Sequence, residues 1–186
     1  MKIGITGTHG VGKTSLAHSL VGKLKEKGIH AIVTSEHERQ CPLPTGTEER
    51  NSIEASMWIL GKQFIEEIEL EFKYPVVICD RTMICDYAYL LWNLKKNPKM
   101  KDNPRVKAVS EMVDKMVKTY DYLFRIPIIN QTTLMKDGFR STTTTWQKEI
   151  DEIIDKIIKE KNLKTYIIPL DTNERRVKAV LDIINL

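Results

Sequence analysis

The sequence predicts an α/β fold in which one five-stranded parallel sheet is covered by helices on both faces. Apolar, β-rich runs alternate along the chain with segments of helical periodicity, so each pair of successive strands has room for a crossover helix. The 186 residues are 41% hydrophobic, which suits a single domain over 1–186 whose core needs no disulfide bonds. We therefore expect a three-layer α/β/α sandwich.

The individual elements follow from the local patterns. Short apolar runs predict strands near 2–6, 31–36, 76–80, 122–128 and 165–170. Apolar residues spaced three and four apart predict helices near 13–27, 48–73, 83–96, 104–119, 145–161 and 173–185. At the start of the fifth helix, Thr144 and Gln147 have the spacing of a capping box.

A phosphate-binding motif lies between the first strand and the first helix. Residues 7–14 read G-T-H-G-V-G-K-T and match the pattern G-x-x-x-x-G-K-[ST]. The glycines allow successive backbone N–H groups to point inward, and the N-terminus of the following helix favours anions. The sequence therefore predicts a P-loop NTPase that binds ATP or GTP. The expected nucleotide contacts are Thr8, His9, Gly10, Val11, Gly12, Lys13, Thr14 and Ser15.

Two residues of this loop have specific expected roles. Lys13 would contact the β- and γ-phosphates, and the Thr14 hydroxyl would be a ligand of Mg²⁺, which otherwise binds phosphate oxygens and water. His9 occupies a variable position of the motif, where a passive role is favoured over acid–base chemistry. ATP or GTP together with Mg²⁺ are thus the expected cofactors.

Charged residues follow the second and third strands. Glu36 and Arg39 come after the second, and Asp80 and Arg81 come after the apolar run 76–79. Ligand sites in open parallel sheets gather beyond the carboxyl ends of the strands. Glu36 and Asp80 are therefore the candidates for proton acceptor, with Asp80 and Thr14 as candidate metal ligands. Each arginine can hold phosphate oxygens bidentately, and a structural salt bridge is the competing interpretation for each.

Together these motifs resemble the P-loop kinase group that contains thymidylate kinases, deoxynucleoside kinases and the nicotinamide riboside kinase domain. The likeness is strongest to the small ATPase family related to that last domain, and it spans nearly the whole chain. It is carried by the phosphate loop, Glu36-x-x-Arg39, Gln63 with Glu67, Asp80-Arg81 with Asp86 and Tyr89, and Asp137-Gly138-x-Arg140.

This resemblance implies a nucleoside/nucleotide kinase-like fold with a lid region at about 134–146. Arg140 in that lid would contact the triphosphate and neutralise charge during transfer, and Gly138 is consistent with a hinge. The candidate catalytic residues are Lys13, Glu36, Asp80, Arg81 and Arg140.

The acceptor site is less sharply defined. Gln63 could form a hydrogen bond to a base and Trp58 could stack on it, while a core position for Trp58 and a solvated Gln63 fit the pattern equally well. The substrate-binding candidates are Glu36, Arg39, Gln63 and Arg81.

Three hypotheses of function remain. The favoured one is an ATP- and Mg²⁺-dependent phosphotransferase that acts on a small nucleoside- or nucleotide-like acceptor. The second is a nucleotide-binding switch or NTPase that acts through a protein partner, although the N-K-x-D guanine motif of Ras-like switches is missing from the sequence. The third is a nucleic-acid 5′-end kinase, supported by the basic segment 95–107, which is better explained as an exposed connection between two helices.

Composition narrows the remaining classes. The net charge of +4 comes from 29 basic and 25 acidic residues mixed along the chain, which argues against a nucleic-acid partner. The three cysteines are odd in number and lack C-x-x-C spacing, so neither a disulfide nor a metal site built from cysteines is expected. Apolar stretches fall short of the roughly 18 residues of a membrane span. We expect a cytoplasmic protein without membrane contact, and a homodimer stays open.

Overall fold

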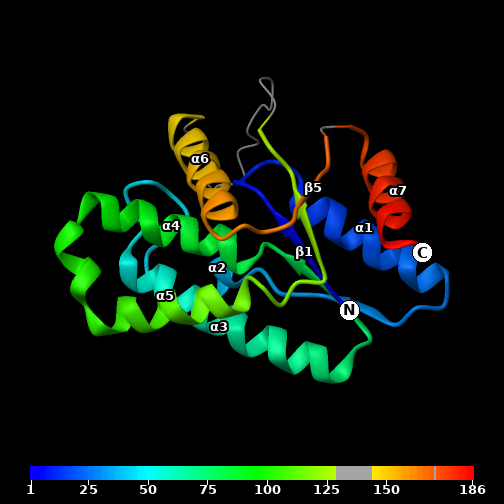
Figure 1. The fold of residues 1–186 in the computed structure, drawn as a ribbon, viewed down its shortest axis with the longest axis horizontal. Coiled ribbons are helices and arrows are strands. Elements are labelled where there is room, and N and C mark those ends of the chain that lie inside the picture. Colours follow the sequence, from blue (N-terminus) through cyan, green and yellow to red (C-terminus); the bar gives the residue numbers. More distant parts are fainter. Residues whose placement is uncertain (129–143, 170) are drawn as a thin grey trace.

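The structure is a computed structural model that describes residues 1–128, 144–169 and 171–186. Within these residues, five parallel strands form one sheet in the order β2-β3-β1-β4-β5 (Figure 1). The strands are β1 (Lys2–Thr6), β2 (Ala31–Val33), β3 (Val76–Asp80), β4 (Tyr122–Arg125) and β5 (Tyr166–Ile167). The helices are α1 (Lys13–Glu26), α2 (His37–Gln40), α3 (Ile53–Lys73), α4 (Met83–Lys96), the 3₁₀ helix η1 (Pro98–Asp102), α5 (Pro104–Met116), α6 (Thr144–Glu160) and α7 (Asn173–Ile184).

Helices cover both faces of the sheet, as predicted for a three-layer α/β/α sandwich. Helices α1 and α7 lie side by side over one face, while α3, α4, α5 and α6 lie on the other side (Figure 1). Each face has its own apolar core. In the first core, α1 and α7 pack on side chains of the sheet such as Ile5 and Phe124. In the second core, helices α3, α4, α5 and α6 pack together around Leu60, Ile84 and Ile150.

The central strand β1 sets the geometry of the carboxyl edge. It pairs with β3 on one side, where Ile5 faces Asp80, and with β4 on the other, where Thr6 faces Arg125. All of β1 is buried. The loop that follows β1 therefore begins directly between the ends of β3 and β4.

Most elements lie where the sequence predicts them, but several ends differ. Strand β2 stops at Val33 rather than at residue 36, and β4 stops at Arg125 rather than at residue 128. Helix α3 begins at Ile53 rather than at residue 48, because the Ser52 hydroxyl caps it by accepting from the N–H of Ala55. The four-residue helix α2 is too short to show a helical period, so the sequence did not predict it.

The basic segment 95–107 is mostly exposed, as expected, and its residues 97–103, which contain η1, connect the end of α4 to the start of α5. In the part of the chain that the structure describes, no helix combines the length and the apolar character that a membrane crossing needs.

Candidate functional site

The phosphate loop joins β1 to α1 and turns through left-handed glycines. Gly10 has φ 77° and Gly12 has φ 85°, a region that other residues rarely adopt. Lys13 opens α1 and is buried, and its Nζ donates to the backbone oxygen of Thr8 at 2.7 Å. The first turn of α1 contains no acidic residue, so its N-terminal dipole is not neutralised from within the helix. This is the arrangement that a phosphate-binding loop requires, and the predicted nucleotide contacts of residues 8–15 stay predictions.

Helix α6 is joined to this loop by two hydrogen bonds. The Gln147 side-chain Nε2 donates to the backbone oxygen of His9 at 2.7 Å, and the Thr8 hydroxyl donates to the backbone oxygen of Gln147 at 3.1 Å. The His9 and Trp146 rings lie 5.1 Å apart, centroid to centroid. The expected capping box is therefore wrong, because Thr144 is already helical and the Gln147 amide serves the phosphate loop instead.

Helix α7 holds the other side of the loop. The Arg176 guanidinium donates through Nη1 to the backbone oxygen of Val11 at 3.1 Å and through Nε to that of Pro169 at 3.1 Å. A Cβ at Gly12 would lie 2.9 Å from Arg176 Nη1 and would displace the end of that side chain, but it is the φ of 85° that favours glycine here. Burial lowers the pKa of Arg176, partly offset by Asp171. Two distant helices thus support the loop through its backbone carbonyls.

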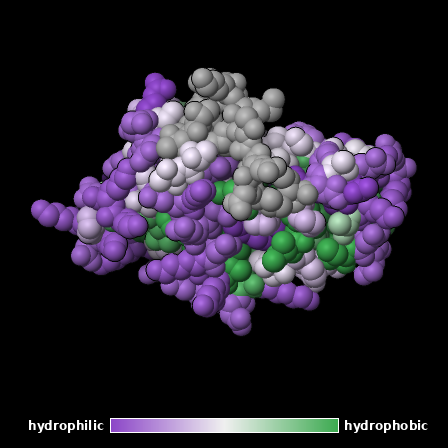
Figure 2. Space-filling model, turned by 90° about the horizontal axis from the view of Figure 1, so that it is seen from above, coloured by the Kyte–Doolittle hydropathy of each residue, from purple (hydrophilic) through white to green (hydrophobic). Residues whose placement is uncertain are grey.

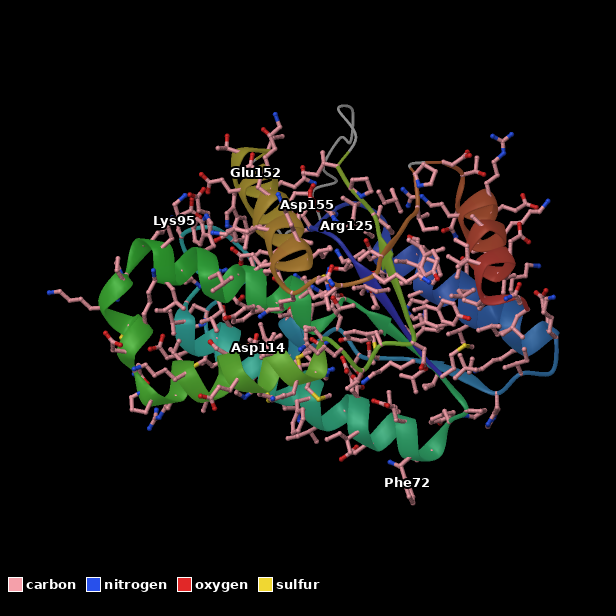
Figure 3. The ribbon with its side chains drawn as sticks, in the orientation of Figure 1. Phe72, Lys95, Asp114, Arg125, Glu152 and Asp155 are labelled. Atoms are coloured by element: carbon pink, nitrogen blue, oxygen red, sulfur yellow. The ribbon has the colours of Figure 1, made fainter. Side chains whose placement is uncertain are left out.

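A buried arginine anchors α6 to the sheet. Arg125, at the end of β4, lies 2.8 Å from Asp151 and 2.8 Å from Asp155, both on α6. Figure 3 shows Arg125 and Asp155 close together between the sheet and α6. Burial opposes the Arg125 charge, but the two carboxylates outweigh it and raise the pKa of Arg125. The first turn of α6 is thereby positioned against the phosphate loop.

Asp80 ends β3 beside the loop and has an unsatisfied acceptor. Its backbone N–H donates to the Thr34 hydroxyl at 3.0 Å. Its side chain is buried, and Oδ1 has no hydrogen-bond partner among the described residues. A buried acceptor without a donor is costly unless a ligand supplies one. A cation or a hydrogen-bond donor at this point would satisfy it.

Arg81 adopts a left-handed backbone conformation with φ 77° and buries its guanidinium. Nη1 pairs with Glu38 of α2, Nε lies 3.4 Å from Asp86 Oδ1, and the guanidinium carbon lies 5.3 Å from the centre of the Tyr89 ring. Burial opposes the charge, but Glu38 and then Asp86 hold the pKa of Arg81 well above its usual value. Burial also raises the pKa of Asp86, which Arg81 partly offsets. Sequence reasoning missed Glu38.

Glu36 and Arg39 lie at the start of α2 and form an ion pair, with 2.6 Å between Arg39 Nε and Glu36 Oε2. The salt-bridge interpretation of Arg39 is therefore present in the structure, and its binding of phosphate stays a prediction. Next to them, His37 lies 2.8 Å from Glu66 on α3. Ser35 donates to the same carboxylate through its N–H and its hydroxyl.

Gln63 lies on α3 and is buried, so the solvated interpretation of this residue is wrong. Its Nε2 donates to Glu67 Oε1 at 2.8 Å and to the backbone oxygen of Arg81 at 3.2 Å. Glu67 is fully buried and also receives the Tyr120 hydroxyl at 2.8 Å and the Lys2 ammonium at 3.2 Å. A network of polar side chains therefore runs between α3 and the sheet and reaches Arg81 at the candidate site.

One narrow pocket brings several of these residues together. Its volume is sufficient for about one water molecule. Its lining is Thr34, Ser35, His37, Glu38, Ile59, Gln63, Asp80, Arg81 and Asp86. The pocket lies beyond the carboxyl ends of β2 and β3, next to the phosphate loop that follows β1.

Seen from above, the molecular surface is mostly hydrophilic with smaller apolar patches (Figure 2).

Two expectations fall outside this description. Arg140 lies outside the described residues, and so does the lid region up to residue 143. Their expected contacts with the triphosphate stay predictions.

Comparisons with known proteins support the P-loop kinase-like fold. A family model described as an AAA domain matches residues 2–176. No curated protein sequence is similar enough to count as a relative. Among solved structures, the chain is similar to a deoxyadenosine kinase from M. mycoides solved with its products, with TM-score 0.73 and 15% identity over 100% of this chain and 99% of that one.

Two further structures share the fold. NadR protein in complex with NR has TM-score 0.71 and 17% identity, and the match covers all of this chain but 52% of that one. Thymidylate kinase from Ehrlichia chaffeensis has TM-score 0.56 and 15% identity over 99% of this chain and 98% of that one. The predicted P-loop nucleoside kinase-like architecture is confirmed.

Proposed function

This chain belongs to the AAA domain family, and from that premise we propose that it is an ATP- and Mg²⁺-dependent phosphotransferase acting on a small nucleoside- or nucleotide-like acceptor. The single observation that carries this proposal is the pairing of β1 with β3. It sets the phosphate loop beside the pocket that Gln63, Asp80 and Arg81 line. Donor and acceptor would therefore meet at one edge of the sheet.

The kinds of molecule that bind to proteins of this fold support the acceptor class. Solved structures of the deoxyadenosine kinase hold dCMP, dATP or dCTP, and NadR structures hold NR or NAD with AMP-PNP. All of these ligands are nucleosides or nucleotides. The buried lining of the pocket, which has room for about one water molecule, suits one polar group of such an acceptor better than an apolar group, and the rest of the acceptor would lie outside this pocket.

The residues present fit a bound magnesium ion. Asp80 Oδ1 is a buried oxygen without a partner among the described residues, and Thr14 is in the first turn of α1. The described residues contain no cluster of three or more His, Cys, Asp or Glu that could enclose a metal. Mg²⁺ takes most of its ligands from phosphate and water, so two protein oxygens can be enough to hold it. When bound, it would neutralise charge on the phosphates, with Thr14 and Asp80 as the protein ligands.

The protein's own groups then have the following roles. Lys13 would leave the Thr8 carbonyl for the β- and γ-phosphates, at the cost of one hydrogen bond. An acceptor hydroxyl oxygen forms a bond to the γ-phosphorus, the bond from that phosphorus to the β–γ bridging oxygen breaks, and ADP departs. Glu36 would take the hydroxyl proton, and Arg81 would stabilise the charge on the transferred group. When Glu36 has passed this proton on to solvent, its carboxylate would again be charged and would pair with Arg39.

The test uses purified protein, Mg²⁺ and γ-labelled ATP or GTP with nucleosides, nucleoside monophosphates, nicotinamide riboside and 5′-hydroxyl oligonucleotides. Label in one small-molecule class supports the proposal and names the acceptor. Lys13→Ala should abolish transfer, whereas Lys25→Ala, an exposed lysine of the same helix, should not. Slow phosphate release that no acceptor changes would show a switch or NTPase that acts through a partner. Label in oligonucleotides alone would show a 5′-end kinase.

Two expectations need other measurements. Sedimentation of the purified protein determines whether it is a homodimer, and localisation in cells determines whether it is cytoplasmic.

A further inference from the structure

Glu36, the proposed proton acceptor, lies in a stretch of chain that has little regular structure of its own. Strand β2 ends at Val33, and α2 begins at His37 and has only four residues. A helix of about one turn is not stable by itself, because fixing its first turn costs more than its hydrogen bonds return. The Glu36 carboxylate does not cap α2 either. Contacts with the rest of the protein must therefore determine where Glu36 lies.

The residues on both sides of Glu36 contact one carboxylate, that of Glu66 on α3. The Ser35 N–H donates to both of its oxygens, at 3.1 and 3.0 Å, and the Ser35 hydroxyl donates to Oε1 at 2.6 Å. His37 Nε2 lies 2.8 Å from Glu66 Oε2. The residue before Glu36 and the residue after it therefore share a single anchor.

This anchor belongs to a well-packed part of the molecule. Glu66 lies on a helix of 21 residues that packs against α4 and β3. The ends of the segment 34–38 have other partners, because the Thr34 N–H donates to the backbone of β3 at 3.0 Å and Glu38 pairs with Arg81. Glu66 thus holds the middle of the segment, which contains Glu36.

We propose that Glu66 is a positioning residue that holds Glu36 where it can take the proton of the acceptor hydroxyl. This inference rests on the proposed function, in which Glu36 is the proton acceptor. Glu66 is not part of the pocket lining, and it acts through the chain on each side of Glu36. A catalytic group misplaced by about 1 Å can lose about 10²-fold in rate. Loss of the anchor therefore slows the transfer step itself.

The first experiment measures transfer from γ-labelled ATP with Mg²⁺ to deoxyadenosine, or to the first of the other small acceptors named above that takes label. Glu66→Ala should lower kcat by about 10- to 100-fold. Its Kd for ATP, from titration calorimetry, should stay within about 2-fold of the wild-type value, because Ser35 and His37 lie outside the phosphate loop. Glu69→Ala changes an exposed glutamate of the same helix and should keep both values. A wild-type kcat in Glu66→Ala, or a loss of ATP affinity as large as the loss in kcat, would overturn the inference.

A double-mutant cycle with Glu36 separates positioning from a purely structural role. Glu36→Gln alone removes the proton acceptor and should slow transfer by about 10²–10⁴. Adding Glu66→Ala to it should lower kcat by less than about 2-fold more, because no base is left to misplace. If the losses of the two single variants multiply in the double variant, Glu66 supports the fold alone and the inference is wrong.

Ser35→Ala keeps the test decisive if Glu66→Ala does not fold. It removes the hydroxyl hydrogen bond of an exposed residue and leaves the N–H bonds in place. The fall in kcat should be smaller than for Glu66→Ala and should again disappear when Glu36 is replaced by glutamine. A fall that persists in that background would contradict the positioning role.

The outcomes distinguish this inference from the proposed function. If no small acceptor takes label, the proposed function fails and the inference fails with it. If label is transferred but Glu36→Gln is as fast as the wild type, or the losses multiply, the inference fails and the phosphotransferase stands.

Discussion

Gln147→Ala should weaken ATP binding although Gln147 lies on α6, 138 positions away from its partner in the phosphate loop. The variant removes the 2.7 Å hydrogen bond from Gln147 Nε2 to the backbone oxygen of His9, and both residues are buried. A buried carbonyl left without a donor costs about 1–3 kcal/mol. If the loop must recover its shape when nucleotide binds, that cost appears in affinity, as a Kd roughly 5- to 150-fold higher.

Two measurements on the same variant separate binding from folding. Titration calorimetry with Mg²⁺ and ATP gives the loss of affinity, and urea unfolding without nucleotide gives the loss of stability. The loss in binding free energy and the loss in unfolding free energy should add up to the cost of the missing hydrogen bond, because that cost must appear in one of the two quantities. Lys148→Ala, an exposed neighbour on the same turn, is the control and should change neither quantity.

The reasoning is refuted by one clear result. If Gln147→Ala lowers stability by the full amount yet binds ATP as tightly as the wild type, the bond serves the fold alone. Wild-type values in both experiments would show that the contact contributes nothing measurable.

Three other predictions follow from the charged groups. The Asp151 side chain is 13% exposed, so Asp151→Asn should lower the free energy of unfolding in urea by about 1.5–3 kcal/mol. The Asp155 side chain is 63% exposed, so Asp155→Asn should lower it by less than about 1 kcal/mol. Equal losses in the two variants would contradict the argument from burial. Burial opposes the charge of Glu66, but its hydrogen bonds from His37 and Ser35 prevail and lower its pKa below 4.5, so its stabilisation is present above pH 4.5 and is lost as the pH falls through the lowered value. The stability gap between wild type and Glu66→Gln should thus narrow in acid, and a widening gap would be inconsistent with it. Asp80→Asn should weaken Mg²⁺ dependence, whereas Glu36→Gln should keep it and slow transfer by about 10²–10⁴; near-normal rates in both would remove the assignment.

Local signals account for what the sequence predicts well. The phosphate loop is a contiguous motif, and Asp80 directly follows the unbroken apolar run 76–79 within β3. Because both strands end at the same edge of a parallel sheet, the closeness of Asp80 to the loop follows from topology. The strands and the long helices were predictable because their signals are also local: apolar runs for the strands, and apolar residues spaced three and four apart for the helices.

Contacts between distant segments account for what the sequence does not show. Glu38 lies 43 positions from Arg81 and sits on a helix of four residues, too short to predict. The left-handed backbone of Arg81 determines which carboxylates it meets, and no local pattern signals such a conformation for an arginine. Gln147 fits a capping box in sequence, yet a tertiary contact takes its amide.

The conformation of Arg81 also limits how this protein can be stabilised by engineering. A left-handed arginine costs roughly 1–2 kcal/mol, and a search guided by backbone geometry would replace it with glycine. That exchange would leave the buried carboxylates of Glu38 and Asp86 without their shared cation, which costs more than the backbone gains. Thermostable variants selected from a library should therefore retain arginine at 81 and gain their stability elsewhere, so this position is a poor choice for substitution by glycine.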